Sequence, residues 1–173
     1  NHAPGSTFTH VFANPGTYIV RMYNVTTVGC NSTVFAKSVT VDPNHSITLS
    51  PVSGPIDQTR CINTLITPIV FTLGGGATNA TVTGLPPGVT YIVAGTTLTI
   101  TGTPTSTAAS PYIYTIVTSG NTCVVADTTG TIVVEPVHTI TLEPGSVTDQ
   151  SVCVNTAITP IVYTLGGGAN NVT

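Results

Sequence analysis

The sequence contains very little charge. Charged residues make up only 5% of its 173 residues, with three Lys and Arg side chains against six Asp and Glu. The basic residues Arg21, Lys37 and Arg60 are far apart in the sequence. So few basic groups cannot form the positive patch that binds nucleic acid or anionic lipid. We therefore expect no nucleic-acid partner.

The sequence also lacks tryptophan, long apolar runs and most of the strong helix formers. No stretch approaches the roughly 18 consecutive apolar residues of a membrane helix, so we expect no membrane span here. Thr, Val and Ile are abundant, and β-branched residues favour strands. A hydrophobic content of 40% with clear alternation argues against disorder. The composition predicts an all-β fold.

One long phrase occurs twice. It reads ITPIVFTLGGGATN at Ile66–Asn79 and ITPIVYTLGGGANN at Ile158–Asn171. The match extends upstream to HSITLSP, which begins at His45, and HTITLEP, which begins at His138. The offset is 93 residues at the start and 92 later. A period of this size suits one β-sandwich domain per repeat.

Acid-proline pairs mark the boundaries between the repeats. SVTVDPNHSITL and TIVVEPVHTITL each indicate a strand, an acid followed by proline, and a new strand. We therefore expect residues 1–43 to be the C-terminal part of one domain, 44–136 a complete domain, and 137–173 the N-terminal part of the next. The chain would then be a segment of a longer tandem array.

The complete domain is expected to contain seven or eight short strands. Turns rich in Gly and Pro, such as Pro86-Pro87-Gly88, separate stretches of alternating apolar and polar residues. This pattern predicts two packed sheets rather than a helical fold. The residues expected in the core are Leu49, Ile69, Phe71, Val82, Leu85, Leu98, Ile100, Tyr114, Ile116, Ile132 and Val134.

Two stretches resemble known repeat families. GSTFTHVFANPGTYIVRMYNVTTVGCNSTVFAKSVTV (Gly5–Val41) is similar to the C-terminal half of a polycystic-kidney-disease-type (PKD) domain. GLPPGVTYIVAGTTLTITGTPTSTAASPYIYTI (Gly84–Ile116) resembles a bacterial immunoglobulin-like (Ig-like) repeat. A Cys-x-Asn-Thr motif begins at Cys61 and again at Cys153. Together these features look like the repeat regions of giant Bacteroidota surface adhesins, including gliding-motility adhesins exported by the type IX system.

This resemblance implies tandem Ig-like β-sandwiches located outside the cell, at the cell surface. The function it implies is a structural stalk that projects a binding region and bears tension in adhesion or gliding. Neighbouring repeats of the same chain would be its main partners, with surface glycans or lateral self-association as further ones. Two alternatives stay open: a glycan- or protein-binding Ig-like module, and spacer repeats of a secreted hydrolase.

The four cysteines form two repeat-equivalent sets. Cys61 and Cys153 lie early in the repeat, and Cys30 and Cys123 lie late. One early and one late cysteine per domain suggests a disulfide per repeat in an oxidising compartment. The candidate pair is Cys61–Cys123. Cys30 and Cys153 would each pair with a cysteine outside residues 1–173. If both cysteines lie beside turns at opposite ends of a sandwich, Cys61 would instead meet the late cysteine of the following repeat; free thiols are the third alternative.

No catalytic, cofactor or metal site is expected, and the chain is predicted not to be an enzyme. The sequence has no G-x-S-x-G motif and no D-x-D-x-D-G calcium loop. Gly74-Gly75-Gly76 lacks the Lys-Ser/Thr that follows in a phosphate-binding loop. His45 and His138 are repeat equivalents at a junction, so we expect them to pack or hydrogen-bond there rather than to act in catalysis.

Two threonine features suggest modification or binding. Asp127-Thr128-Thr129 resembles the short O-glycosylation signal of Bacteroidota, which would place a sugar on Thr128. Every second residue from Thr97 to Thr105 is threonine, and such a ridge could bind ice or glycan. The plainer interpretation is that threonine is a good β residue that keeps an uncharged surface hydrated.

Overall fold

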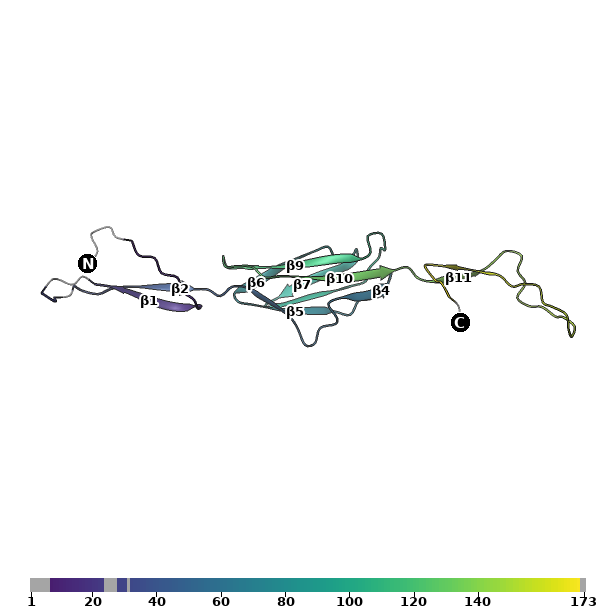
Figure 1. Cartoon of the computed structure of the whole chain (residues 1–173), viewed down its shortest axis with the longest axis horizontal. Coiled ribbons are helices and arrows are strands. Elements are labelled where there is room, and N and C mark those ends of the chain that lie inside the picture. Colours follow the sequence, from purple (N-terminus) through teal and green to yellow (C-terminus); the bar gives the residue numbers. More distant parts are fainter. Residues whose placement is uncertain (1–6, 24–27, 31, 172–173) are drawn as a thin grey trace.

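The chain folds into strands, turns and loops. The computed structural model describes residues 7–23, 28–30 and 32–171, so parts of the predicted first domain lie outside the described residues. These residues contain twelve strands and no helix, and therefore no helix that could cross a membrane. The prediction of an all-β fold is confirmed. The strands (Figure 1) are β1 (Gly16–Met22), β2 (Phe35–Val41), β3 (Ser46–Leu49), β4 (Gln58–Cys61), β5 (Ile69–Gly74), β6 (Ala77–Thr83), β7 (Val89–Ala94), β8 (Thr97–Gly102), β9 (Tyr112–Gly120), β10 (Asp127–Glu135), β11 (Thr139–Leu142) and β12 (Tyr163–Gly166).

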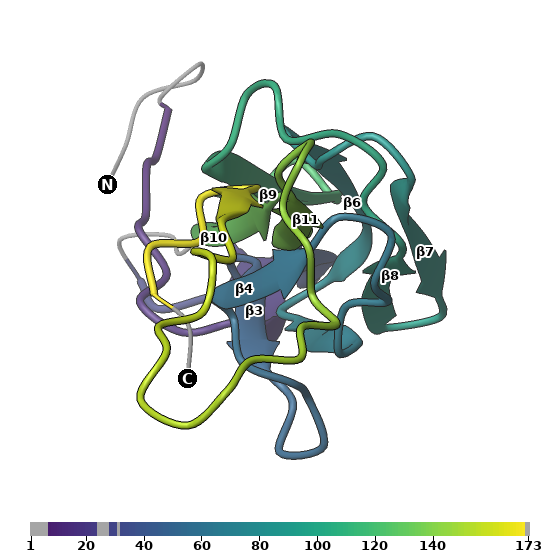
Figure 2. The same ribbon diagram turned by 90° about the vertical axis from the view of Figure 1, so that its right-hand side faces the viewer.

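Eight of these strands build a sandwich of two four-stranded sheets. One sheet has the order β3-β5-β8-β7, and the other has the order β4-β10-β9-β6. All neighbours are antiparallel except β4 and β10, which run parallel. The consecutive strands β3 and β4 therefore lie in different sheets. Figure 2 shows the sandwich from its end.

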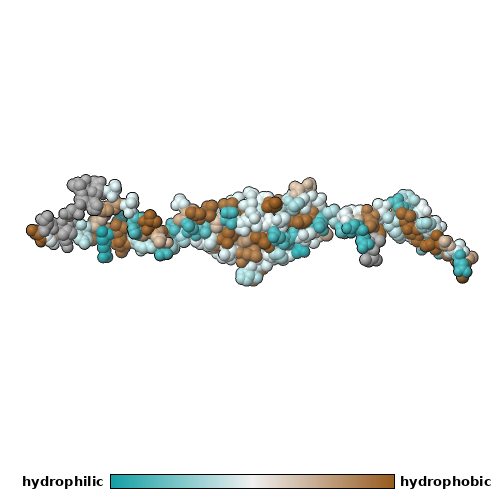
Figure 3. Space-filling view, viewed as in Figure 1, coloured by the Kyte–Doolittle hydropathy of each residue, from teal (hydrophilic) through white to brown (hydrophobic). Residues whose placement is uncertain are grey.

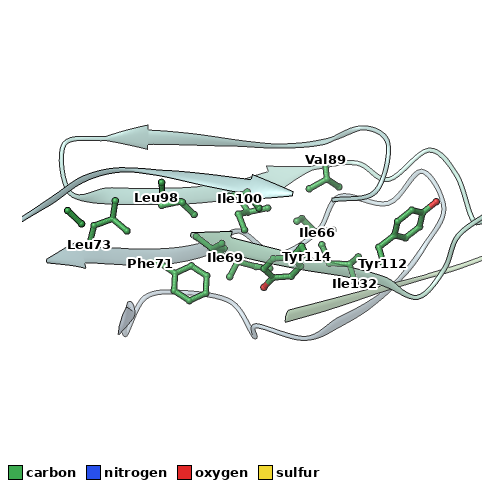
Figure 4. Packing of buried hydrophobic residues seen from close by; sticks show 14 of the residues in the cluster. Ile66, Ile69, Phe71, Leu73, Val89, Leu98, Ile100, Tyr112, Tyr114 and Ile132 are labelled. Carbon is green, nitrogen blue, oxygen red and sulfur yellow. The ribbon is translucent and has the colours of Figure 1, made fainter. Parts of the chain in front are cut away.

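One apolar core lies between the two sheets (Figure 4). Alternate residues of each strand point inward, because successive side chains of a strand face opposite sides. On β8, Leu98 and Ile100 are fully buried while the intervening Thr99 is only half-buried. The buried apolar residues are Ile66, Ile69, Phe71, Leu73, Ala77, Ala80, Val82, Val89, Leu98, Ile100, Tyr112, Tyr114, Ile116, Ile132 and Val134.

Two of the predicted core residues differ from expectation. The expected positions on β5, β6, β8, β9 and β10 are all buried. Leu49 is 45% exposed, because it ends a four-residue edge strand just where the chain leaves for the other sheet. Leu85 is only partly buried and packs against the core from the connection between β6 and β7. Ala77 and Ala80 are buried although their small side chains give little hydrophobic signal.

The segments before and after the sandwich form two-stranded sheets. β1 pairs with β2, and β11 pairs with β12, both antiparallel. The pairing of β11 with β12 starts at Thr139↔Gly166, and that of β3 with β5 starts at Ser46↔Gly74. Both pairings continue for four residues in the same register. The repeat in the sequence is therefore also a repeat in strand pairing.

A glutamine network is repeated as well. Gln58 is buried at the start of β4. Its Nε2 donates to the carbonyl oxygens of Pro55 and Thr67 at 3.1 and 2.7 Å, and its Oε1 accepts from the Thr67 backbone N–H at 2.9 Å. Gln150 makes the same three bonds in the last segment. These bonds fasten β4 to the segment that leads into β5 in the opposite sheet.

The chain enters the sandwich at one end and leaves it at the other (Figure 1). We call the end that contains residues 42–45 the N-terminal pole. The end that contains residues 61–64 and 135–136 is the C-terminal pole. Since β10 runs the length of the sandwich before the chain leaves at Pro136, the two ends of residues 44–136 point in opposite directions.

Candidate functional site

The N-terminal pole holds the connection between β2 and β3 through His45. This side chain is only 7% exposed. Its Nδ1 is hydrogen-bonded with Thr118 Oγ1 at 3.0 Å, and its Nε2 with Asn121 Oδ1 at 2.9 Å. Its backbone N–H donates to Val124 O at 2.9 Å. The ring and the backbone of His45 are thus both fixed to the end of β9 and the loop that follows it.

The same loop also contacts the residues that precede His45. Asn121 Nδ2 donates to Pro43 O at 3.5 Å, and Cys123 Sγ donates to Asp42 O at 3.5 Å. The Cys123 backbone N–H donates to Asn121 Oδ1 at 3.0 Å, which holds the amide in place. The loop between β9 and β10 therefore grips the connection that leads in from the preceding segment.

The glycines of the repeated phrase also lie against this connection. Gly75 adopts φ +65°, a left-handed conformation that favours glycine. A Cβ at Gly75 would overlap with the Asn44 carbonyl oxygen. At the repeat-equivalent Gly167, also at φ +65°, a Cβ would overlap with Val137 O. The TLGGG phrase therefore forms the turn on which the linker rests.

The C-terminal pole holds Cys61 and the turn of the Cys-x-Asn-Thr motif. Cys61 ends β4, where it is in register with Glu135 of β10. The next backbone N–H, of Ile62, donates to Glu135 O at 2.8 Å. Asn63 then adopts φ +63°, which asparagine tolerates better than most residues. The motif thus encodes a turn that ends β4 beside the point where the chain leaves the sandwich.

The predicted disulfide between Cys61 and Cys123 is wrong. No disulfide forms among the described residues. Cys61 lies beside Glu135, the last residue of β10, whereas Cys123 precedes Asp127, the first residue of the same strand. A strand of nine residues spans about 26–30 Å, and a disulfide requires Cα atoms within about 7 Å. The two thiols are at opposite poles.

The structure gives Thr128 a poor position for a sugar. Thr128 is half-buried and pairs with the fully buried Ile116. It alternates in phase with the inward-facing Gly130 and Ile132 of β10. A glycan on an inward-facing side chain would have to leave through the rim of the sandwich. O-glycosylation at Thr128 stays a prediction that this geometry does not favour.

The threonine ridge is shorter than the sequence predicts. β8 ends at Gly102, so Thr103 and Thr105 lie beyond the strand. Their backbone N–H groups donate to Gly88 O and Pro87 O at 3.0 and 2.9 Å in the turn region. Only the threonines up to 101 share the outer face of β8. They continue an exposed row across the sheet, in which Thr48, Thr72 and Thr97 pair in register on β3, β5 and β8.

Tyr114 is a buried polar residue whose contacts indicate a structural role rather than a catalytic one. Its hydroxyl donates to Ile56 O at 2.8 Å, and its ring lies against Gly130. Burial, with a smaller contribution from the charge of Asp57, raises the pKa of the Tyr114 phenol well above its usual range. The neutral phenol therefore joins β9 to the loop before β4.

The described part of the chain shows no surface cluster of groups that could hold a metal ion. Among the described residues, no three His, Cys, Asp or Glu side chains come together in a way that could hold a metal ion. An open cleft of about 340 Å³ lies beside Pro136 and His138, and another of about 620 Å³ lies between the edges of β6 and β7. The first cleft is lined by Glu135, His138 and Asn170 beside proline and glycine, and the second is mostly apolar. Neither lining contains a Ser or Cys nucleophile beside a base.

Comparison with known proteins assigns no family or function to the chain. No protein-family model matches the chain, and no curated protein is similar to it. The features that distinguish the molecule are its two poles, each of which joins the sandwich to a further segment of chain. These poles are the candidate functional site.

Proposed function

We propose that the chain is a segment of an extracellular structural stalk built from tandem Ig-like sandwiches. Residues 1–43, 44–136 and 137–173 are parts of three successive repeats. The stalk projects a binding region from the cell surface and bears tension in adhesion or gliding. The cell-surface location rests on the resemblance to surface adhesins.

The strand order supports the Ig-like assignment. In constant-type Ig domains, strands A, B, E and D form one sheet, and strands C, F and G form the other. If β3 and β4 are the two halves of strand A, the order β3-β5-β8-β7 corresponds to A-B-E-D. The order β10-β9-β6 then corresponds to G-F-C. The parallel pairing of β4 with β10 places the second half of strand A beside strand G.

The stalk proposal rests on the contacts between the sandwich and the linker, residues 42–45. β2 ends at Val41, and each of the next four residues contacts the sandwich through the bonds of the N-terminal pole or through Gly75. All four linker residues therefore lie against the sandwich. A flexible Gly- and Ser-rich linker would behave as a random coil. The junction is built to pass orientation and force from one repeat to the next.

The positions of the terminal strands suit a chain under tension. Pulling on the two ends of residues 44–136 draws β3, and through it β4, toward the N-terminal pole, and it draws β10 toward the C-terminal pole. Because β4 and β10 are parallel neighbours, from Ile132↔Gln58 to Glu135↔Cys61, this load shears their bonds along the strand direction. Sheared bonds share the load, whereas bonds that are peeled apart break one at a time.

The distribution of apolar side chains on the surface fits a stalk better than a protein with one specific docking patch. On the face seen in Figure 3, apolar and polar side chains are interspersed over the sandwich. Exposed Ile92 and Ile113 lie on different sheets of the sandwich. Scattered apolar residues of this kind are normal on a protein surface.

Force spectroscopy on a chain of four fused copies of residues 44–136, under reducing conditions, tests this function. We expect one rupture per copy, each releasing roughly 300 Å of chain. Gln58→Leu removes the bonds that fasten β4 and should lower the rupture force. Thr81→Ala, at an exposed position of β6, should leave it unchanged. Extension of the copies without measurable resistance would exclude a stalk that bears tension.

A second candidate function is glycan binding by the threonine row. The observation that favours it is the register of the exposed Thr48, Thr72 and Thr97 across three strands. A glycan array probed with residues 44–136 tests it. Saturable binding that Thr72→Val abolishes would support a binding module, and uniform background would exclude one for the glycans on the array. A spacer of a secreted hydrolase would show the stalk's mechanics and no glycan binding.

A further inference from the structure

Each repeat carries its two cysteines at opposite poles, and therefore at two different junctions. Cys61 lies at the C-terminal pole beside Glu135, and Cys123 lies at the N-terminal pole beside Asp42. The following inference rests on the tandem arrangement proposed above. It concerns which cysteines would meet at a junction between two complete repeats.

Asp42 and Glu135 occupy the same place in successive repeats. Each follows or ends the last strand of its repeat and precedes a proline, and the two are 93 residues apart. At the C-terminal pole, Glu135 O accepts the N–H of Ile62, the neighbour of Cys61, at 2.8 Å. At the N-terminal pole, Asp42 O accepts the thiol hydrogen of Cys123 at 3.5 Å. The carbonyl group of this acid therefore lies beside two cysteines at a junction. One is the early cysteine of its own repeat, and the other is the late cysteine of the following repeat.

We propose that successive repeats are joined by a disulfide across each junction. Cys61 would pair with the residue of the following repeat that is equivalent to Cys123. Cys123 would pair with the residue of the preceding repeat that is equivalent to Cys61. The adjacent parallel strands β4 and β10 bring the early cysteine within about 5 Å, between Cα atoms, of the acid that the late cysteine contacts. This geometry is compatible with the short Cα separation that a disulfide needs.

The oxidation requires a disulfide-containing oxidant such as oxidised glutathione. The thiolate of one cysteine attacks a sulfur of the oxidant, which releases one oxidant thiol and leaves a mixed disulfide. The second cysteine then attacks the protein sulfur of that mixed disulfide and displaces the other oxidant thiol. Two cysteine thiols lose two electrons and two protons, and the oxidant gains both. The product staples the end of one sandwich to the beginning of the next.

A protein made of two fused copies of residues 44–136 tests this proposal. The fusion keeps the natural spacing of the junction, because Glu135 and Pro136 then precede Asn44 and His45. Residues 44–136 include all eight strands of the sandwich and its whole core, so each copy can fold independently. After equilibration with oxidised and reduced glutathione, we expect one disulfide and two free thiols per molecule. Peptide mapping without reduction should link Cys61 of the first copy to Cys123 of the second.

Matched serine variants locate the bond. Cys61→Ser in the first copy should abolish the disulfide, while the same change in the second copy should leave it intact. A variant that retains only Cys61 of the first copy and Cys123 of the second should still oxidise fully. The 173-residue chain lacks both junction partners and should keep four thiols within the monomer.

Two results would overturn the proposal. One is a disulfide between Cys61 and Cys123 of the same copy, and the other is four free thiols in a folded two-copy protein with a normal β circular-dichroism spectrum. Neither result bears on the stalk function, since the force measurement is made under reducing conditions. A two-copy protein that resists force but forms no disulfide would support the stalk function and contradict the disulfide between repeats.

Discussion

At the scale of single residues, Gly75 of the repeated TLGGG phrase is needed for a close contact with the linker. Its φ of +65° matches that of Gly95, at +60°, but the surroundings differ. A Cβ at Gly95 would meet no atom within 4 Å, whereas a Cβ at Gly75 would overlap with Asn44 O. Conformation and contact can therefore be separated by one pair of variants.

We expect Gly95→Ala to lower the free energy of unfolding by about 1–2 kcal/mol, the cost of a left-handed residue with a Cβ. Gly75→Ala should cost several kcal/mol in total, because the linker must also move. Urea unfolding of the 173-residue chain with each variant measures the difference, because this chain contains the whole linker, residues 42–45. Equal losses would show that the contact with Asn44 is unimportant.

Tyr114 predicts a dependence of stability on alkaline pH. Because burial raises the pKa of Tyr114 in the folded state, the unfolded chain ionises first as the pH rises above 10.0. The stability contribution of the neutral phenol is therefore complete below pH 10.0 and is lost progressively above it. Tyr114→Phe should make the unfolding free energy fall less steeply between pH 9 and pH 12.

The same variant should be less stable at neutral pH. Loss of the hydroxyl leaves Ile56 O without its donor, at an expected cost of about 1–3 kcal/mol. Tyr163→Phe, at a 48% exposed position, is the control for both measurements. An unchanged pH slope in Tyr114→Phe would mean that another group governs the alkaline limit.

At the scale of elements, the start of β3 depends on the loop between β9 and β10. His45 and His138 are equivalent in sequence, but only His45 is buried and bonded to that loop. His45→Ala should therefore lower the unfolding free energy of the sandwich by about 2–4 kcal/mol, since Thr118 and Asn121 lose buried partners.

His138→Ala in the same 173-residue chain should change that free energy by less than about 0.5 kcal/mol. Thermal unfolding of the two variants measures both values. Similar effects from the two substitutions would argue against the network at the N-terminal pole.

At the scale of the whole molecule, the linker decides whether the repeats form a rod. Inserting Gly-Ser-Gly-Ser after Pro136 in the two-copy protein separates the junction from its contacts. We expect a shorter mean end-to-end distance and a broader distance distribution, because the inserted residues behave as a flexible coil. Small-angle X-ray scattering of the reduced proteins measures both. A distribution unchanged by the insertion would mean that the natural junction is already flexible.

The sequence by itself determined the fold class, the period and most of the core. Alternation assigns Leu98 and Ile100 to the interior because the side-chain period of a strand is two residues. The repeated phrases predict equivalent strands, and β3–β5 and β11–β12 pair in the same register. These properties are local, so they can be followed residue by residue along the chain.

Only the tertiary structure decided what lies at each pole. Sequence spacing placed Cys61 and Cys123 in one repeat but could not show that the length of β10 separates them. It also could not show that Gly75 supports the linker or that His45 is bonded to the end of β9. These contacts join residues many positions apart, and they depend on which strands become neighbours when the two sheets close over the core.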